Sequence, residues 1–354
     1  MATSNAATTY LERRVLDYIF KNDSLSFASP GNSIYVGLAT AVSAAEKGNL
    51  TEVQIDTDDA NYTRKQVTAS NWKQSTTTLG LALTNSATEI HLVDAEAFPT
   101  SGTIQIDDEL ITYTGKGSTA TADVNGALSS STALVVDGNS GTIAVGMVVT
   151  GTGISGTVYV TTVTNQNNLV LNTAITVSND VALNFDGTNT LTGGTRGTSS
   201  TTAYAHSAAD TVISDAQRVI NDNNIEFPAA AGTAASYTVT HAFVADKDIA
   251  TANVNGATSS TTAVTLDGNV GTVAVGDIVT GTGITGATSG VVRVATVTSQ
   301  TNIALDTAVS LSDDTVLTFD GSNILFVGAL DASKSVAAGD IFRINAGNLS
   351  IELK

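Results

Sequence analysis

Two segments of this chain are near copies of each other, and this internal repeat constrains the fold more than any other feature. Copy one spans residues 121–189, and copy two spans residues 251–323. The two copies align without a gap, except that only copy two contains residues 287–290. Roughly 60% of the aligned positions are identical, which predicts that both copies adopt one fold.

Each copy has the sequence pattern of a small all-β domain. Alternating runs rich in Val, Ile and Thr recur in copy one, separated by turn-forming Gly, Asn and Asp. A period of two places Val and Ile on one face of a strand and Thr on the other. The pattern predicts a β-sandwich or a small barrel, with strands at 133–136, 142–150, 157–164, 169–171 and 181–185.

The segments on either side of copy one are strand-like, but neither has enough apolar residues to form a core alone. We therefore expect residues 76–120 and 190–213 to form one inserted β module. Copy one would then be inserted at the tip of a hairpin near residues 115–118, where insertions are tolerated.

The remaining pieces, residues 1–75, 214–250 and 324–354, are expected to form a discontinuous base domain. It contains the one convincing helix, Thr9–Lys21, with a capping box from Thr9 to Glu12. Leu11, Val15, Tyr18 and Ile19 fall on one face of this helix and form an expected core stripe. Residues 238–245 should pair with residues 323–329 as antiparallel strands, with copy two in place of their turn. The expected fold class is thus all-β and multi-domain, with nested insertions and an N-terminal helix.

Charge and composition exclude several classes of protein. The chain has 33 acidic and 15 basic residues, a net charge of −18, so it has no basic surface for a nucleic-acid backbone. It has no apolar run of the length that spans a membrane, and its first residues lack the layout of a signal peptide. It has no Cys, which excludes disulfides, thiol catalysis and zinc sites made of Cys.

No motif predicts an enzyme or a cofactor. The three histidines, His91, His206 and His241, are not spaced as paired metal ligands, and we interpret them as strand-face or loop residues. The densest acidic cluster is residues 107–109. It is either an acid–base pair or a solvated strand end, and the second interpretation is favoured because nothing indicates a pocket.

Each repeat also contains residues that could form a calcium site. Asx side chains in a Gly-containing loop can ligate a hard cation, while a hairpin turn explains the same residues more simply. The candidate ligands are Asp137 and Asn139 in copy one, and Asp267 and Asn269 in copy two.

Three parts of the chain resemble bacteriophage proteins. The base segments YLERRVLDYIF, SIYVGLAT and TVTHAFVADKD resemble small virion proteins of tailed phages. The segments FPTSGTIQIDDELITYTG and GGTRGTSSTTAYAHSAADTVI resemble a module common in phage structural proteins. The repeat, with SSSTALVVDGNSGTIAVGMVVTGTGISG, is similar to Ig-like decorations in virion proteins of marine and cyanobacterial phages. The resemblance implies a structural part of the virion.

Two functions fit that resemblance. The first is a capsid decoration or cement protein on the outer head surface, with projecting β domains. The second is a tail-fibre or other tail-attached protein with an adhesive, receptor-binding role. Either implies capsid or tail proteins of the same virion as partners, no nucleic acid or membrane, and weak contact with host-surface glycans. The protein would be assembled in the host cytoplasm and extracellular in the particle.

The resemblance further implies a homo-oligomer, expected to be a trimer. The helix carries more aromatic residues than one core stripe needs, so we predict that it contributes an assembly surface. Its residues would be Tyr10, Arg14, Tyr18 and Phe20.

Overall fold

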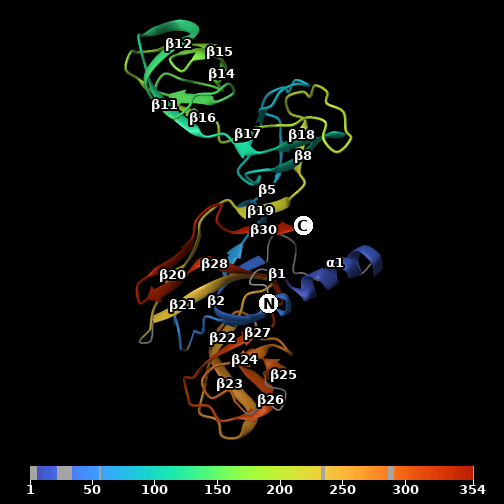
Figure 1. Ribbon diagram of the computed structural model, residues 1–354. Coiled ribbons are helices and arrows are strands. Elements are labelled where there is room, and N and C mark those ends of the chain that lie inside the picture. The colour runs from blue at the N-terminus through green and yellow to red at the C-terminus, as the bar shows by residue number, and fades with distance from the viewer. Residues whose placement is uncertain (1–5, 22–33, 56, 233–235, 286–290, 354) are drawn as a thin grey trace. The chain divides into compact units, whose positions relative to one another are not determined.

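The computed structural model describes residues 6–21, 34–55, 57–232, 236–285 and 291–353. It consists mainly of antiparallel strands with one α-helix, which confirms the predicted fold class (Figure 1). The chain divides into two compact units. Unit 1 comprises residues 1–72 and 223–346 and contains copy two, whereas unit 2 comprises residues 73–222 and 347–354 and contains copy one. The finer division into four domains stays a prediction. Within the described residues, no helix has the length and apolar character needed to cross a membrane.

The central sheet of unit 1 forms because its strands carry long apolar runs. Residues 36–39 are fully or almost fully buried, and at Gly37 an added Cβ would lie 2.2 Å from the Phe243 ring, so only glycine admits that ring. The sheet order is β1 (Ala6–Ala7), β28 (Ile324–Ala337), β21 (Ser236–Ala245), β2 (Ile34–Ala44) and β3 (Asn49–Glu52), with β4 (Lys65–Val67) also paired to β2. The unit also contains the pair β20 (Ile225–Ala229) and β29 (Ile341–Ile344), and the 3₁₀ turns η1 (Ala45–Lys47) and η2 (Ala69–Asn71).

Strands β21 and β28 pair across copy two, as the sequence predicts. His241 lies opposite Ala329, and Ala245 lies opposite Ile324, in an antiparallel register. Copy two occupies the place of the turn between these strands.

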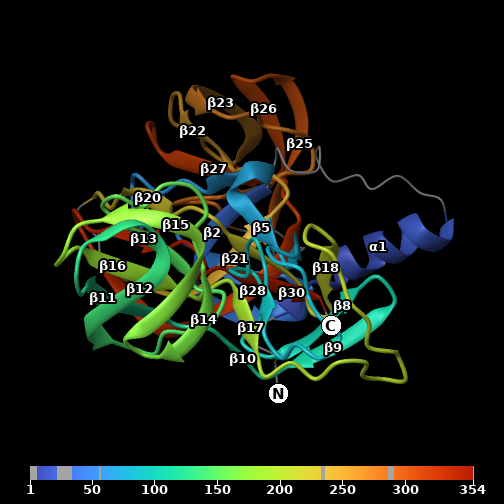
Figure 2. The same ribbon diagram turned by 90° about the horizontal axis from the view of Figure 1, so that it is seen from above.

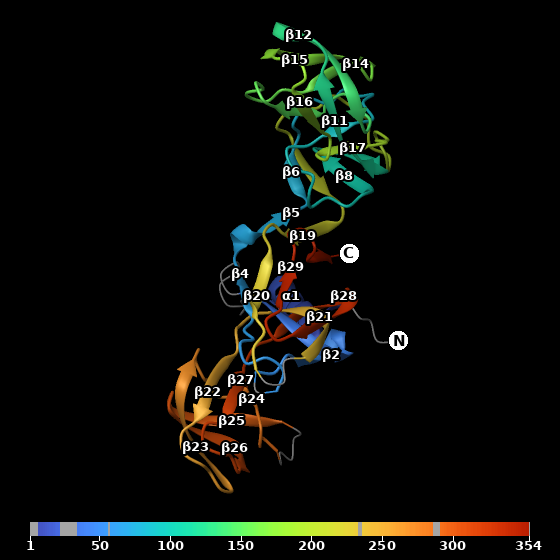
Figure 3. The ribbon, with the colours of Figure 1, turned by 90° about the vertical axis from the view of Figure 1, so that its left-hand side faces the viewer.

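Copy two is a closed six-stranded barrel (Figure 3). Its strands are β22 (Ala250–Val254), β23 (Thr261–Val270), β24 (Ile278–Thr280), β25 (Val292–Ser299), β26 (Asn302–Val309) and β27 (Val316–Asp320). Around the ring they follow the order β22, β23, β26, β25, β24, β27. One continuous ring differs from the two facing sheets of an Ig-like sandwich, so the barrel alternative is the one observed.

Copy one has the same strand order, which confirms that the two repeats share a fold (Figure 2). Its sheet runs β13 (Val148–Gly151), β16 (Ala182–Asp186), β11 (Thr119–Val124), β12 (Leu128–Ser140), β15 (Asn168–Val177) and β14 (Val160–Asn165). An isolated bridge from Val148 to Tyr159 joins its two ends. The insertion at 287–290, where the copies were expected to differ most, lies outside the described residues.

Two local predictions in the repeats were wrong. Residues 142–147 were expected in a strand, but strand β13 begins only at Val148. Residues 137–139 were expected in a turn or cation loop, but they lie inside β12. Gly138 has φ 61° beside a break in the strand register, so the Gly accommodates a bulge rather than a hairpin turn. The equivalent Gly268 in β23 has φ 59°.

Outside copy one, unit 2 consists of short strands. One sheet runs β6 (Thr76–Thr78), β18 (Thr211–Ser214), β8 (Gly102–Ile106) and β9 (Glu109–Tyr113). A second runs β10 (Gly115–Lys116), β17 (Thr190–Thr192) and β7 (Ile90–His91), and a third β30 (Ser350–Leu353), β19 (Gln217–Asn221) and β5 (Trp72–Gln74). Gly115 pairs with Thr192, so the chain enters and leaves copy one through neighbouring strands, as expected for insertion at a hairpin tip.

Helix α1 spans Thr9–Lys21, the predicted range, but its cap differs from the prediction. The hydroxyl oxygen of Thr8, rather than that of Thr9, accepts a backbone N–H at the helix start, from Leu11 at 3.4 Å. The Thr8 hydroxyl donates to the carbonyl oxygen of Ile324 at 2.5 Å. This bond attaches the start of the helix to β28, which explains why the helix begins one residue after a buried threonine.

Candidate functional site

Helix α1 carries an exposed apolar stripe. Val15, Leu16, Ile19 and Phe20 are 40%, 55%, 60% and 78% exposed. Their spacing of three and four residues places them on one side of the helix. Full burial of such side chains contributes about 1.5–3 kcal/mol each, so a contiguous exposed set is typical of a contact surface. The prediction that Val15 and Ile19 belong to a core stripe was therefore wrong.

The four residues predicted for assembly divide between two sides of α1. Phe20 belongs to the exposed apolar stripe. Tyr10 and Arg14, one turn apart, are partly buried and lie on the other side of the helix. The side chain of Tyr18 lies outside the described residues. Sequence analysis found the helix and missed Leu16 and Ile19, because periodicity alone does not say which stripe a partner covers.

Unit 2 contains a buried carboxylate, Glu109, at the start of β9. Its side chain and the Arg196 guanidinium are 0% and 6% exposed, and they form a bidentate ion pair with N–O distances of 2.8 and 2.7 Å. The backbone N–H of Gly197 donates to Glu109 Oε1 at 2.9 Å. His206 Nε2 lies 2.8 Å from Glu109 Oε2. These contacts attach the long connection between β17 and β18 to the β8–β9 hairpin.

The contacts of Glu109 control its charge. Burial by itself raises the pKa of this carboxyl group, but hydrogen bonds from Arg196, His206 and the Gly197 N–H outweigh burial and hold the pKa at about 2. Glu109 is therefore a carboxylate at neutral pH, and it accepts all of these hydrogen bonds.

Acid should destabilise the module through Glu109. Its pKa is lower in the folded state, about 2, than the ordinary value of 4.5, so its stabilising contribution is complete above pH 4.5 and decreases as the pH approaches 2. The loss is about 3 kcal/mol at full protonation. Urea unfolding between pH 2 and 7, followed by hydrogen exchange in 76–113 and 190–214, measures it. Glu109→Gln should remove this pH dependence, and the exposed control Asp108→Asn should keep it. An unchanged pH dependence in Glu109→Gln would disprove the assignment.

His206 is also surrounded by two aspartates. Its ring Nδ1 lies 3.2 Å from Asp107 Oδ2 and 3.9 Å from Asp210 Oδ2. Ligand atoms of the three residues all lie within 4.8 Å of one another. Asp107 lies in the β8–β9 turn with φ 50°, so the expectation that Asp107 and Glu109 point the same way from one strand was wrong in its geometry. Nevertheless, both residues contact the same imidazole ring.

Each of the other two histidines lies beside a threonine hydroxyl. His91 Nδ1 lies 2.9 Å from Thr190 Oγ1, and His241 Nδ1 lies 2.8 Å from Thr240 Oγ1. Burial lowers the pKa of both rings. The sequence analysis did not predict the acidic cluster around His206, because Asp107 is 99 residues away from it in the chain. The sequence sign of the cluster was the spacing of four residues between His206 and Asp210.

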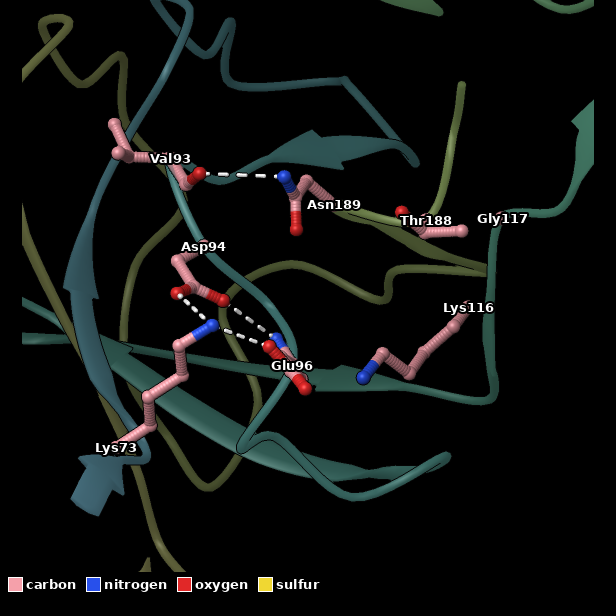
Figure 4. A pocket seen from close by; sticks show the side chains of 8 residues that line it. All are labelled: Lys73, Val93, Asp94, Glu96, Lys116, Gly117, Thr188 and Asn189. Carbon is pink, nitrogen blue, oxygen red and sulfur yellow. Dashed lines mark hydrogen bonds and ion pairs between the residues drawn. The ribbon is translucent and has the colours of Figure 1, made fainter. Parts of the chain in front are cut away.

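A pocket of about 520 Å³ lies in unit 2 beside the entry to copy one (Figure 4). Lys73, at one side, forms ion pairs with Glu96, with Asp94 at 3.4 Å and with Asp222 at 3.0 Å. These acidic neighbours, Glu96 first, raise the pKa of Lys73. The positive charge of Lys73 is therefore compensated by these three carboxylates.

Amide and ammonium groups on the other side of the pocket hold the junction with copy one. Asn189 Nδ2 donates to the carbonyl oxygen of Val93 at 3.3 Å (Figure 4). Asn189 Oδ1 accepts the N–H of Ala95 at 2.9 Å. Lys116 Nζ donates to the carbonyl oxygens of Ala95 and Phe98. These bonds connect both ends of copy one to the segment 93–98. The residues that line the pocket therefore stabilise the junction with copy one.

The calcium candidates lie at equivalent positions in the two barrels. Asn139 Nδ2 donates to the carbonyl oxygen of Gln166 at 2.5 Å, and Asn269 Nδ2 donates to that of Gln300 at 2.6 Å. Asp137 and Asp267 lie in strands β12 and β23, two residues before each asparagine. The amide groups thus bind a neighbouring loop, and calcium binding at these four residues stays a prediction.

Residues 6–106 are similar to a protein family described as Podophage GP4 fiber I protein gp80. The matched segment contains α1 and the strands from β1 to β8. It ends before copy one begins, so neither barrel belongs to it. No curated protein matches the chain, and no solved structure matches it.

Proposed function

We propose that this protein is a structural component of a phage tail fibre, and that its base, around the central sheet of unit 1, attaches it to the virion. The observation that carries the proposal is the similarity of residues 6–106 to a family described as a podophage fibre protein. That description names a fibre, so it favours the tail-attached hypothesis over the capsid decoration that the sequence alone favoured. A fibre protein has a structural role in the particle rather than a catalytic one.

Helix α1 supplies the proposed attachment surface. It lies inside the matched segment, and its stripe of Val15, Leu16, Ile19 and Phe20 is exposed. We assign this stripe to contact between copies of the chain, and we expect the assembly to be a trimer. The trimer would lie next to the tail protein to which the fibre is attached. Apolar stripes of this length commonly bury against another helix or sheet.

The two barrels have a separate role in this proposal. Each replaces a turn between neighbouring strands, with copy one between β10 and β17 and copy two between β21 and β28. Neither contributes a strand to the sheet that carries it. We assign them to the outer surface of the fibre, where weak contact with host glycans would take place. Their acidic, Thr- and Gly-rich surfaces suit exposure to solvent.

Substitutions on α1 test the proposed attachment surface. Leu16→Gln, Ile19→Gln and Phe20→Gln together should lower the number of copies per particle by at least about 10-fold, because several apolar contacts are lost at once. Quantitative mass spectrometry of purified virions measures the copy number. Sedimentation of the isolated protein measures its oligomeric state, which should shift toward monomer.

A matched control carries Lys21→Gln, an exposed position of the same helix on the side away from the apolar stripe. This variant should assemble as the unmodified protein does. Normal copy number in the triple variant, with a circular-dichroism spectrum that shows an intact fold, would contradict the assignment of the stripe to attachment.

A further inference from the structure

Three side chains in the inserted module present metal-ligand atoms to one point. His206 Nδ1 lies 3.2 Å from Asp107 Oδ2 and 3.9 Å from Asp210 Oδ2. A tetrahedral ion with bonds of about 2.0–2.2 Å to nitrogen and oxygen holds its ligands roughly 3.3 Å apart. The observed separations are close to that value, so only small side-chain movements would complete the coordination.

The other ring nitrogen of His206 is already positioned as in metal-binding histidines. Nε2 lies 2.8 Å from Oε2 of Glu109, a carboxylate that the Arg196 guanidinium also binds. A carboxylate only accepts, so Nε2 must carry the proton, and the lone pair of a neutral ring is left on Nδ1. Ligating histidines commonly have this arrangement, in which a carboxylate behind the ring fixes the tautomer and the orientation.

The charges around His206 favour a bound cation. Asp107, Glu109 and Asp210 contribute three negative charges, and Arg196 contributes one positive charge. With a neutral ring the cluster therefore has a net charge of −2. A lone pair on Nδ1 facing Asp107 Oδ2 at 3.2 Å is repulsive unless a proton or a metal ion lies between them.

The surroundings make His206 rigid and leave the aspartates open. The His206 side chain is fully buried, and the Tyr204 ring lies over it with centroids 4.5 Å apart. The side chains of Asp107 and Asp210 are 58% and 32% exposed. An ion could therefore enter from solvent and keep water at its remaining positions.

We propose that Asp107, His206 and Asp210 bind one divalent transition-metal ion of the zinc class. One imidazole nitrogen with two carboxylate oxygens suits zinc, cobalt, nickel or manganese, whereas calcium and magnesium prefer oxygen ligands only. The ion connects the β8–β9 turn to the segment before β18. Its role is to stabilise the module that carries copy one, independent of where the protein lies in the virion.

Titration of the metal-free full-length protein, without an affinity tag, tests this proposal. Calorimetry with Zn²⁺ should show one saturable site per chain. Co²⁺ should give visible absorption bands of a bound ion, and either metal should raise the unfolding temperature. Calcium and magnesium should give no such site.

Conservative variants locate the site without disturbing Glu109. Asp107→Asn and Asp210→Asn should each weaken Zn²⁺ binding by at least about 10-fold. Asp108→Asn, the neighbouring control outside the cluster, should leave binding unchanged. The proposal is overturned if the unmodified protein has no saturable site, if both variants bind as tightly as the control, or if calcium binds in place of zinc.

Discussion

Replacing Arg64 by methionine is expected to lower the free energy of unfolding of unit 1 by about 3–5 kcal/mol. The Arg64 side chain is fully buried and forms ion pairs with Glu52 at 2.6 Å and Asp320 at 2.7 Å. Its guanidinium also donates to the carbonyl oxygen of Lys247 at 2.9 Å. Methionine fills a similar volume but removes the cation that compensates the largely buried Glu52 carboxylate, and this uncompensated charge is the source of the cost.

The position of Arg64 makes this variant informative about copy two. Lys247 and Asp320 lie immediately before and at the end of the barrel, so one guanidinium holds both of its connections to the central sheet. Chemical denaturation with hydrogen exchange should show lost protection at the two connections as well as in β2.

Arg343→Met is the matched control in the same unit. Arg343 pairs with Glu226 at 2.6 Å, but both side chains are 47% exposed, and exposed pairs contribute at most about 1 kcal/mol. If Arg64→Met costs no more than Arg343→Met, the buried cluster does not fix the barrel to the base.

Glu109→Gln should destabilise unit 2 by a comparable amount, about 3–5 kcal/mol at pH 7. The substitution keeps the shape of the side chain but removes the charge that compensates the buried Arg196 guanidinium. It also places an amide where His206 Nε2 and the Gly197 N–H need acceptors. Equilibrium unfolding with hydrogen exchange in 76–113 and 190–214 measures the loss.

Glu96→Gln provides the comparison within unit 2. Glu96 pairs with Lys73, and its side chain is 44% exposed, so its loss should cost at most about 1 kcal/mol. Equal effects of the two substitutions would mean that the Glu109–Arg196 pair is not the centre of the module.

Sequence analysis predicted the elements that depend on local pattern and repetition. The equal strand order of the two repeats follows from their aligned alternation, and the β21–β28 pairing follows from apolar runs on both sides of copy two. The bounds of α1 follow from its periodicity.

The sequence did not predict contacts between residues far apart in the chain. Arg64 and Asp320 are separated by 256 residues, and Glu109 and Arg196 by 87, so no local spacing indicates either ion pair. A buried carboxylate and a buried guanidinium can be recognised only once the fold is known. The Asp-Gly-Asn segments also misled the analysis, because Gly at positive φ serves a bulge within a strand as well as a turn.

The location of the protein in the virion tests the central claim most directly. Electron cryomicroscopy of particles with and without this protein, with an antibody fragment against copy two as a marker, measures that location. The account predicts that the lost density and the marker both lie on the tail, and that the head surface is unchanged. Loss of density at regular positions on the capsid lattice, with an unaltered tail, would contradict it.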